Sequence, residues 1–344
     1  MNGDIDIRVT GQAGRITLNR PDALNALTHD MCLAIQAALD TWANDVNVAL
    51  VVIDATGDRA FCAGGDIAEM YRTASAGDYE YGRTYWRDEY RLNAKIFNFP
   101  KPYVSFMQGY TMGGGVGVSC HGSHRIVCEN SQIAMPECGI GLVPDVGGSL
   151  LLSRAPGRLG EYLGTTGMRM GPGDAILAEF ADYYVPQAHW KALITALEIS
   201  GNLNMIDQAA LPPPQSPLQA MQSDIDRHFS GETMGDIARS LAHEPGDFSA
   251  AALNTLNQHS PLSLACTIEM IHRIRGNDNI TWALDLEYRF THRAAQYGDF
   301  IEGIRAAVID RDHAPRWQHP TISDVRPIEI SKMLMPLKEN TLKL

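Results

Sequence analysis

Three glycine-rich loops carry the residues of this sequence that could do chemistry. The first, Ala60 to Ile67, contains two adjacent glycines, which let a backbone turn sharply and present N–H groups. The second, Gly113 to Gly117, precedes a short predicted helix, whose N-terminus offers unpaired N–H groups and a positive dipole end to an oxyanion. The third, Met135 to Gly148, holds Glu137 and Asp145, each directly after a proline.

No single loop is diagnostic, because glycine pairs mostly form plain turns and loop carboxylates are usually solvated or cap a helix. The cluster at 113–117 matches neither G-x-G-x-x-G nor a P-loop, so it does not predict a nucleotide site. Together the loops meet one need: two N–H donors that converge on a carbonyl oxygen, with a carboxylate nearby. Such a set stabilises the charge that develops on that oxygen in acyl transfer.

The loops connect segments whose hydrophobic patterns alternate between strand and helix. The patterns predict a hairpin over 5–18, an amphipathic helix capped by Thr28, a buried strand over 48–53 and a helix over 79–97. A strand at 103–107, a short helix at 116–120 and strands at 124–129 and 133–135 follow. Strands and helices that interleave up to about residue 200 predict an α/β core.

The segment Leu211 to Pro217 is rich in proline and cannot form the interior of a helix. Beyond it, residues 218–310 have a largely helical pattern. We therefore expect a core over residues 1–205 and a mainly helical region over residues 206–344.

The charge of the chain bears on its partners. Net charge is −12 and no segment forms a basic stripe, which argues against nucleic acid as a partner. Coenzyme A (CoA) remains compatible, since a small polyanion needs only a few local cations and oriented backbone N–H groups.

The six cysteines show no dense framework, so we expect a reducing compartment. The N-terminus lacks the basic and apolar regions of a secretory signal, and the most apolar stretch, residues 48–53, is too short to span a membrane. The C-terminal Thr-Leu-Lys-Leu falls short of a peroxisomal Ser-Lys-Leu. The expectation is a cytoplasmic protein with no membrane partner.

Cys120, His121, His124 and Cys128 superficially resemble a metal cluster. Their spacing matches no standard zinc site, and the segment runs from a predicted helix into a strand, which would point the side chains apart. We predict core packing here and no metal site.

The three loops resemble, in order and spacing, those of the crotonase (enoyl-CoA hydratase/isomerase) superfamily, and Ile16 to Leu27 is a further match. The resemblance implies a spiral of repeated strand–strand–helix units with a C-terminal helical region, and an acyl-CoA thioester as substrate. It also implies an oxyanion hole made by the N–H groups of Gly65 and Gly114. Trimers or paired trimers are frequent in the superfamily, which leaves a homo-oligomer open for this chain.

Departures from the family pattern bear on the reaction. A hydratase of this family uses two glutamates to hold and activate water; the first position is Gly117 here and the second is Glu137. Asp145 stands where isomerase-type members place a carboxylate. This combination resembles the 3-hydroxyisobutyryl-CoA hydrolase branch, in which the glutamate matching Glu89 contacts the hydroxyacyl portion. Matches at 86–93, 286–289, 299–306 and 309–317 extend the resemblance over about residues 5–325.

The expected reaction is hydrolysis of 3-hydroxyisobutyryl-CoA to 3-hydroxyisobutyrate and CoA, a step of valine degradation. Glu137 either attacks the thioester carbonyl or deprotonates a water, and Asp145 binds the substrate hydroxyl or orients the water. Gly64, Asp66 and Glu89 complete the expected substrate-binding residues. No separate cofactor is expected, because CoA is part of the substrate and its thiol is a good leaving group.

Two carboxylates in one closed site should repel, which would raise the pKa of one of them. The first alternative function is an enoyl-CoA hydratase or isomerase acting on a short-chain enoyl-CoA. A non-catalytic scaffold or an RNA-binding protein is the second, and the net charge and the presence of every expected site residue count against it.

Overall fold

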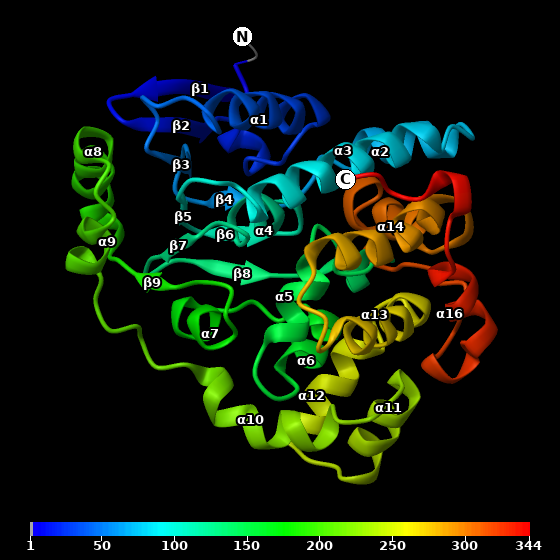
Figure 1. Cartoon of the computed structure of the whole chain (residues 1–344). Coiled ribbons are helices and arrows are strands. Elements are labelled where there is room, and N and C mark those ends of the chain that lie inside the picture. The colour runs from blue at the N-terminus through cyan, green and yellow to red at the C-terminus, as the bar shows by residue number, and fades with distance from the viewer. Residues whose placement is uncertain (1–2) are drawn as a thin grey trace. The chain divides into compact units, whose positions relative to one another are not determined.

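The computed structural model describes residues 3–344 (Figure 1). These residues form two units that alternate along the chain. The first comprises the described residues up to Gly65, together with Arg91–Ala134 and Arg169–Gln219. The second comprises Asp66–Tyr90, Met135–Met168 and Ala220–Leu344. The sequence predicts a different kind of division, into two contiguous segments that meet after residue 205, and this boundary stays a prediction.

The first unit contains a six-stranded sheet with the order β1-β2-β3-β5-β7-β9. β1 and β2 pair antiparallel as the predicted hairpin, and the other neighbours pair parallel. Its strands are β1 (Ile5–Thr10), β2 (Ala13–Leu18), β3 (Leu50–Ala55), β5 (Tyr103–Met107), β7 (His124–Val127) and β9 (Tyr183–Tyr184). The Leu-Val-Val-Ile run of β3 is fully buried, as expected of a central parallel strand.

A second, three-stranded parallel sheet pairs β4 (Ala60–Cys62), β6 (Tyr110–Met112) and β8 (Gln132–Ala134). Successive strands belong to the two sheets alternately. β3, β5 and β7 lie in the large sheet, and the strand that follows each of them lies in the small sheet. Parallel strands end at a common edge, and each of the three glycine-rich loops begins where a strand of the small sheet ends. This alternation brings the starts of the first two loops, which are far apart in sequence, to neighbouring strands at one edge.

The helices of this unit cover the sheets. They are α1 (His29–Trp42), α4 (Gly114–Ser119), α7 (Pro172–Leu177), α8 (Trp190–Ser200) and α9 (Asn204–Ala209), with short 3-10 turns η1 (Pro21–Ala23) and η3 (Gln187–His189). The Thr28 side chain caps α1 by accepting a hydrogen bond from the Met31 N–H at 3.2 Å, which confirms the predicted N-cap.

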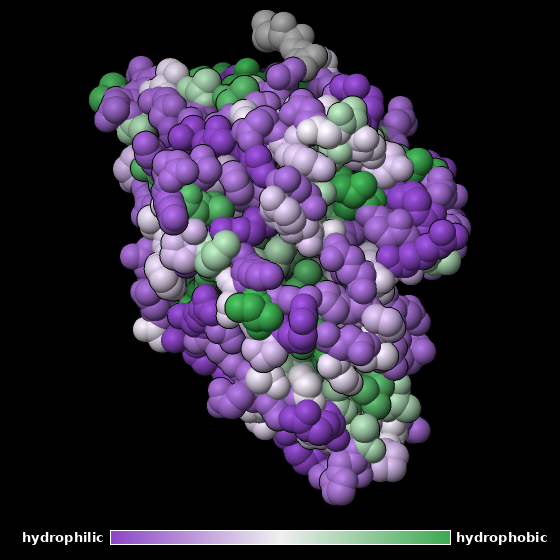
Figure 2. Space-filling view, turned by 90° about the vertical axis from the view of Figure 1, so that its right-hand side faces the viewer, coloured by the Kyte–Doolittle hydropathy of each residue, from purple (hydrophilic) through white to green (hydrophobic). Residues whose placement is uncertain are grey.

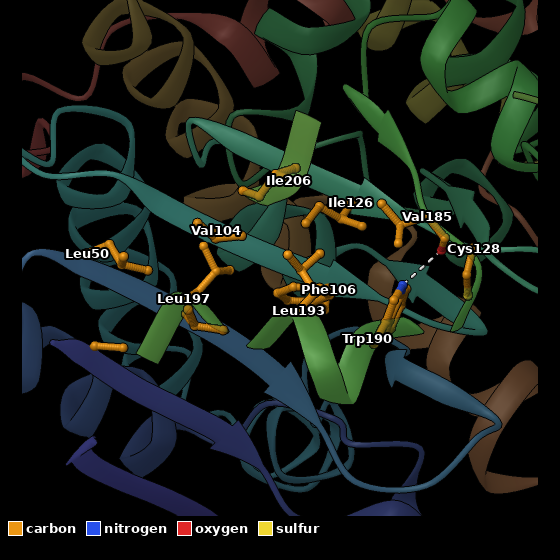
Figure 3. Packing of buried hydrophobic residues seen from close by; sticks show 12 residues of the cluster. Leu50, Val104, Phe106, Ile126, Cys128, Val185, Trp190, Leu193, Leu197 and Ile206 are labelled. Carbon is orange, nitrogen blue, oxygen red and sulfur yellow. Dashed lines mark hydrogen bonds between the residues drawn. The ribbon is translucent and has the colours of Figure 1, made fainter. Parts of the chain in front are cut away.

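Side chains of the central strands and of α8 form a continuous buried cluster (Figure 3). Val104 and Phe106 of β5 lie against Leu193 and Leu197 of α8 in this cluster. The Trp190 indole N–H donates to the Val185 carbonyl at 2.9 Å, so the one polar group of this large side chain is satisfied inside the core. This packing holds the large sheet against α8.

Among its described residues, the regular elements of the second unit are all helices or helical turns. Its elements are α2 (Ala68–Ser75), η2 (Glu137–Ile140), α5 (Gly148–Arg154), α6 (Leu159–Thr166), α11 (Met234–His243), α12 (Asp247–Leu256), α13 (Pro261–Ile274), α14 (Ile280–Tyr297), α15 (Phe300–Ile304), the π-turn η4 (Arg305–Ile309), η5 (Ile322–Asp324), α16 (Pro327–Leu334) and η6 (Lys338–Asn340). α3 (Glu80–Phe97) and α10 (Pro217–His228) include residues of both units. A buried cluster around Phe229, Ile237, Leu264 and Ile268 forms its core.

Most predicted elements are confirmed: α1, β3, α3 and β5 lie within a few residues of the predicted ranges. The sequence patterns did not predict β4, β6, β9 or α2. A three-residue strand shows no usable periodicity, and its pairing with a neighbour, rather than its own pattern, defines it.

Along residues 3–344, no helix has the length and apolar content needed to cross a bilayer. The face in Figure 2 is mostly hydrophilic, with hydrophobic residues in small separate groups. Scattered exposed apolar residues of this kind are normal at protein surfaces.

Candidate active site

The first glycine loop of the first unit is tied to the segment that follows β2. The Leu27 N–H donates to the Gly64 carbonyl at 2.9 Å, and the Ala63 N–H donates to the Leu24 carbonyl at 3.0 Å. The φ angle of Gly64 is +117°, which side chains rarely adopt, and a Cβ there would lie 3.7 Å from the Met112 carbonyl oxygen. Glycine at this position lets the loop pass beside the end of β6.

Helix α4 begins in close contact with strand β4. A Cβ atom at Gly115 would lie 2.3 Å from the carbonyl oxygen of Cys62, so only glycine fits. Among the described residues, neither the Gly65 N–H nor the Gly114 N–H donates to a backbone carbonyl. Both donors are thus uncommitted within the backbone, as an oxyanion hole needs, and that role stays a prediction.

Four of the buried carboxyl groups in the second unit interact electrostatically with one another. They come from three separate segments: helix α3, the loop around η2, and helix α14. Their residues are at most 5% exposed: Glu89 (3%), Glu137 (5%), Asp145 (4%) and Glu287 (0%). Acidic residues are almost never buried without a partner, so a group of four marks a site of special chemistry.

The two loop carboxylates are held by tight local turns. Glu137 begins η2, and its carbonyl accepts the Leu142 N–H at 3.0 Å. Asp145 is followed by Val146, whose φ is +54°, and its carbonyl accepts the Gly148 N–H at 2.6 Å. A β-branched residue in the left-handed region is strained, and such strain is concentrated at functional sites.

Tyr90 hydrogen-bonds to Asp145. Its hydroxyl donates to Oδ2 of Asp145 at 2.7 Å and lies 3.4 Å from the Thr291 hydroxyl of α14. Sequence analysis found Glu89, the neighbour of Tyr90, through the family resemblance but assigned no role to Tyr90 or to Glu287. A tyrosine in a helix and a glutamate 140 residues beyond the loop carry no local signal of their partner.

Burial raises the pKa of Asp145 to about 7, although the hydrogen bond from Tyr90 acts in the opposite direction. Burial also raises the pKa of Glu287 to about 8, opposed by hydrogen bonds from Ser149 and Gly147. Both groups therefore exchange protons near neutral pH.

Burial places the pKa values of Glu89 and Glu137 well above their usual range, and the negative charge of Asp145 raises both further. Smaller contributions to Glu137 come from Glu287 and Glu89. The expected repulsion between loop carboxylates thus involves four groups rather than two. A carboxyl group with a raised pKa can act as a base or as a proton donor near neutrality.

Two oxygens of this cluster stand out. Oε1 of Glu89 and Oε2 of Glu137 are buried and have no hydrogen-bond partner among residues 3–344. Leaving a buried polar atom unpaired is costly, and native structures seldom do so without a functional reason. Both atoms are therefore candidates for contact with a substrate or a water molecule.

Another feature of the second unit is a cavity of about 750 Å³, lined in part by Arg83, His292, Arg293 and Lys332. None of the four buried carboxyl groups lines it. Within the described chain, no group of three or more His, Cys, Asp or Glu side chains is arranged to hold a metal ion.

The predicted site residues thus fall into two sets. Glu89, Glu137 and Asp145 lie together in the second unit. Gly64, Gly65 and Gly114 lie in the first unit, on the neighbouring loops described above. Asp66 is half-buried just before α2, and its expected role in substrate binding stays a prediction.

A family model described as enoyl-CoA hydratase/isomerase matches residues 13–334. The chain belongs to this family. Membership confirms the predicted resemblance and the crotonase-type α/β fold, and it makes the chain an acyl-CoA-processing enzyme.

The curated relatives of this enoyl-CoA hydratase/isomerase family member include the mitochondrial 3-hydroxyisobutyryl-CoA hydrolase of Gallus gallus. It is 36% identical, over 99% of this chain and 91% of that protein. The enzyme of the same name from Homo sapiens is 34% identical, over 97% and 89%.

Solved structures of the family carry other names. One described as an enoyl-CoA hydratase from Rhodobacter sphaeroides 2.4.1 is 55% identical with a TM-score of 0.94, over 99% of this chain and 100% of that one. One described as a carnitinyl-CoA dehydratase from Mycobacterium thermoresistibile is 39% identical with a TM-score of 0.95, over 99% of each chain.

Replacing Gly115 by Ala should prevent α4 from packing on β4. The added methyl group would overlap the Cys62 carbonyl oxygen, a backbone atom that cannot move aside without distorting the sheet. We expect a loss of about 1–3 kcal/mol in the free energy of unfolding, measured by urea denaturation. Gly246→Ala, where a Cβ meets nothing within 4 Å, is the control, and an equal effect of both substitutions would contradict the assignment.

Replacing Asp145 by Asn should stabilise the protein more at pH 8 than at pH 5, each relative to the wild type. The pKa of Asp145 rises from 3.8 to about 7 on folding, so in this interval the unfolded chain is ionised and the folded chain is protonated. The associated stability is complete below pH 3.8 and is lost as the pH rises through 7. Asn does not titrate.

The relative gain of the Asn variant between pH 5 and pH 8 should be roughly 2 kcal/mol, read from urea unfolding at both pH values. A difference between variant and wild type that is independent of pH would show that the pKa of Asp145 is not raised.

Proposed function

We propose that this enzyme hydrolyses a short 3-hydroxyacyl-CoA thioester, with 3-hydroxyisobutyryl-CoA as the preferred substrate. The observation that carries the proposal is the pair of unpaired buried oxygens, Oε1 of Glu89 and Oε2 of Glu137. A 3-hydroxyacyl thioester can place its hydroxyl group against one of these oxygens. Its carbonyl carbon, or the water molecule that attacks this carbon, can lie against the other. The names of the relatives at about 35% identity support the same substrate.

Glu137 drives the chemistry in this proposal. As a nucleophile, its carboxylate attacks the thioester carbonyl, the C–S bond breaks, and water then hydrolyses the mixed anhydride. As a general base, it takes a proton from a water molecule that attacks the same carbon. In both cases the CoA thiolate leaves and is protonated, so no metal or further cofactor is needed. Burial and the neighbouring carboxylates raise the pKa of Glu137, which makes it a stronger base than an ordinary glutamate.

The N–H groups of Gly65 and Gly114 serve as the proposed oxyanion donors. Negative charge develops on the carbonyl oxygen in both routes, and donors oriented in advance lower that barrier by several kcal/mol. Neither N–H is used by another backbone carbonyl in the described part of the chain, which supports this role.

Glu89 and Asp145 recognise the acyl group in the proposal. A hydroxyl both donates and accepts, so it can pair with a buried carboxyl group in either protonation state. A site built to pair with a hydroxyl discriminates strongly against an analogue that lacks it, because its buried polar atom would remain unpaired. This favours a 3-hydroxyacyl group over a plain acyl group.

The second candidate is an enoyl-CoA hydratase, which the name of the 55% identical Rhodobacter sphaeroides structure favours. Hydration in this family uses two glutamates around one water, and Gly117 occupies one of these positions without a side chain. The hydrolase proposal requires only one attacking group and therefore fits the residues better.

Glu137→Gln should reduce thiol release from 3-hydroxyisobutyryl-CoA by about 10²- to 10⁴-fold, because glutamine can neither attack the thioester nor accept a proton. Thiol release is followed with a chromogenic disulfide. Glu269→Gln is the matched control, since this carboxylate is exposed and pairs with Arg273, and its activity should equal that of the wild type.

Hydration of crotonyl-CoA, read as loss of enoyl absorbance, is measured with the same preparations. Absorbance loss without thiol release from any acyl-CoA would make the protein a hydratase. Undiminished thiol release by Glu137→Gln would remove Glu137 from the chemistry.

Glu89→Gln should lower kcat/KM for 3-hydroxyisobutyryl-CoA about 10- to 100-fold more than for isobutyryl-CoA, which lacks the hydroxyl group. The reason is that only the hydroxylated substrate pairs with Glu89 in the proposal. Equal effects on the two substrates would assign Glu89 a role other than hydroxyl recognition.

A further inference from the structure

Glu287 is fully buried in the middle of α14 and enters no ion pair among the described residues. Its carboxylate instead accepts three hydrogen bonds from one short segment. The Gly147 N–H donates to Oε2 at 2.8 Å and the Ser149 N–H to Oε1 at 3.0 Å. The Ser149 hydroxyl also donates to Oε1.

The donors lie two and four residues after Asp145. Directly after Asp145, Val146 has a φ of +54°, which is unfavourable for a β-branched residue, and Gly147 follows with a φ of +80°, which glycine adopts readily. A strained conformation persists only where the surroundings over-determine it. The three hydrogen bonds to Glu287 supply that restraint.

The same helix also holds Asp145 through its side chain. Tyr90, which donates to the Asp145 carboxylate, packs edge-on against the Tyr288 ring with 6.1 Å between centroids. Its hydroxyl is 3.4 Å from the hydroxyl of Thr291. Helix α14 therefore fixes Asp145 twice, through Glu287 on the backbone and through Tyr90 on the carboxylate.

We propose that Glu287 is a positioning residue of the reaction, which fixes the turn 145–149 and so aims the Asp145 carboxylate at the substrate. This inference rests on the proposed function, because it assigns Glu287 a task in the hydrolysis. A displaced Asp145 would still be present but misdirected, and a misplacement of about 1 Å can lower a rate by about 10²-fold.

A buried glutamate beside the first turn of α5 could also serve stability alone, as a helix cap. The pH profile and the rate per folded enzyme, measured together, separate the two roles. Glu137 is faced by three carboxyl groups, Asp145, Glu89 and Glu287, and the charge of each raises its pKa. Removing the charge of Glu287 should therefore lower the pKa of Glu137 and move the acid limb of the rate profile to lower pH, whereas only a positioning role also predicts a loss of kcat per folded enzyme.

The test is Glu287→Gln, with Asp285→Asn as the matched control. Glutamine keeps the volume but has one acceptor oxygen, so its amide N–H₂ must face one of the loop donors. Asp285 lies on the same helix and pairs with Arg289, away from the loop. The control removes one negative charge without touching the 145–149 turn.

For Glu287→Gln we expect kcat to fall about 10²-fold per folded enzyme, with KM changed little and the acid limb at lower pH. Ser149→Ala should produce part of the same loss, and the double variant should lose less than the sum, since both act on one hydrogen-bond group. Asp285→Asn should match the wild type in kcat and in pH profile.

Lower thermal stability with unchanged kcat per folded enzyme would reduce Glu287 to a structural cap and overturn the inference, while the proposed function stands. Failure of the proposed function has another signature, the absence of thiol release from the wild type. In that case carboxyl ¹³C NMR of glutamate-labelled protein, with the Glu137 signal assigned by its loss in Glu137→Gln, reads the pKa of Glu137 without substrate. An unchanged Glu137 pKa in Glu287→Gln would then overturn the inference independently.

Discussion

Burial of four carboxyl groups in one helical unit is the constraint on which the rest of this site depends. Removing a carboxylate from water is so unfavourable that each group must gain hydrogen bonds, bind a proton or do both. Asp145 and Glu287 take the first route in part, through Tyr90, Gly147 and Ser149, and still titrate near neutrality. Glu89 and Glu137 each keep an unpaired oxygen. A substrate that hydrogen-bonds to these two oxygens recovers the free energy that was lost when they were buried without a partner.

In the proposed reaction, the first unit contributes backbone N–H groups rather than side chains. Its two sheets receive alternate strands, so the loops after β4 and β6 start from neighbouring parallel strands and lie side by side. Glycine is needed where these loops meet, because a Cβ at Gly115 would collide with the Cys62 carbonyl. Donors carried by a backbone that is held in this way need no reorganisation when charge develops on a substrate oxygen, which is the physical basis of oxyanion stabilisation.

The chemistry of a family member depends on which carboxylates surround a common backbone arrangement. Here the position at Gly117 has no side chain, while α3 and α14 bring Glu89 and Glu287 to the carboxylates of the η2 loop. Two of the four carboxyl groups thus come from the η2 loop, and the other two come from α3 and α14. The proposed thioester hydrolysis would differ from hydration in these carboxyl groups and not in the sheets.

The sequence by itself determined the class of fold, the family and the loop residues Glu137 and Asp145, since each has a local signature: a glycine pair, a proline before a carboxylate, a buried apolar run. It also predicted α1, β3 and α3, because their hydrophobic patterns extend over enough residues to be recognised. Tertiary structure alone decided that Tyr90 donates to Asp145 and that Glu287 restrains the turn after it. These contacts join residues 55 and 140 positions apart, and no local pattern specifies a partner at such a distance. The raised pKa values were likewise decided in three dimensions, because desolvation depends on what surrounds a carboxyl group and not on its neighbours in sequence.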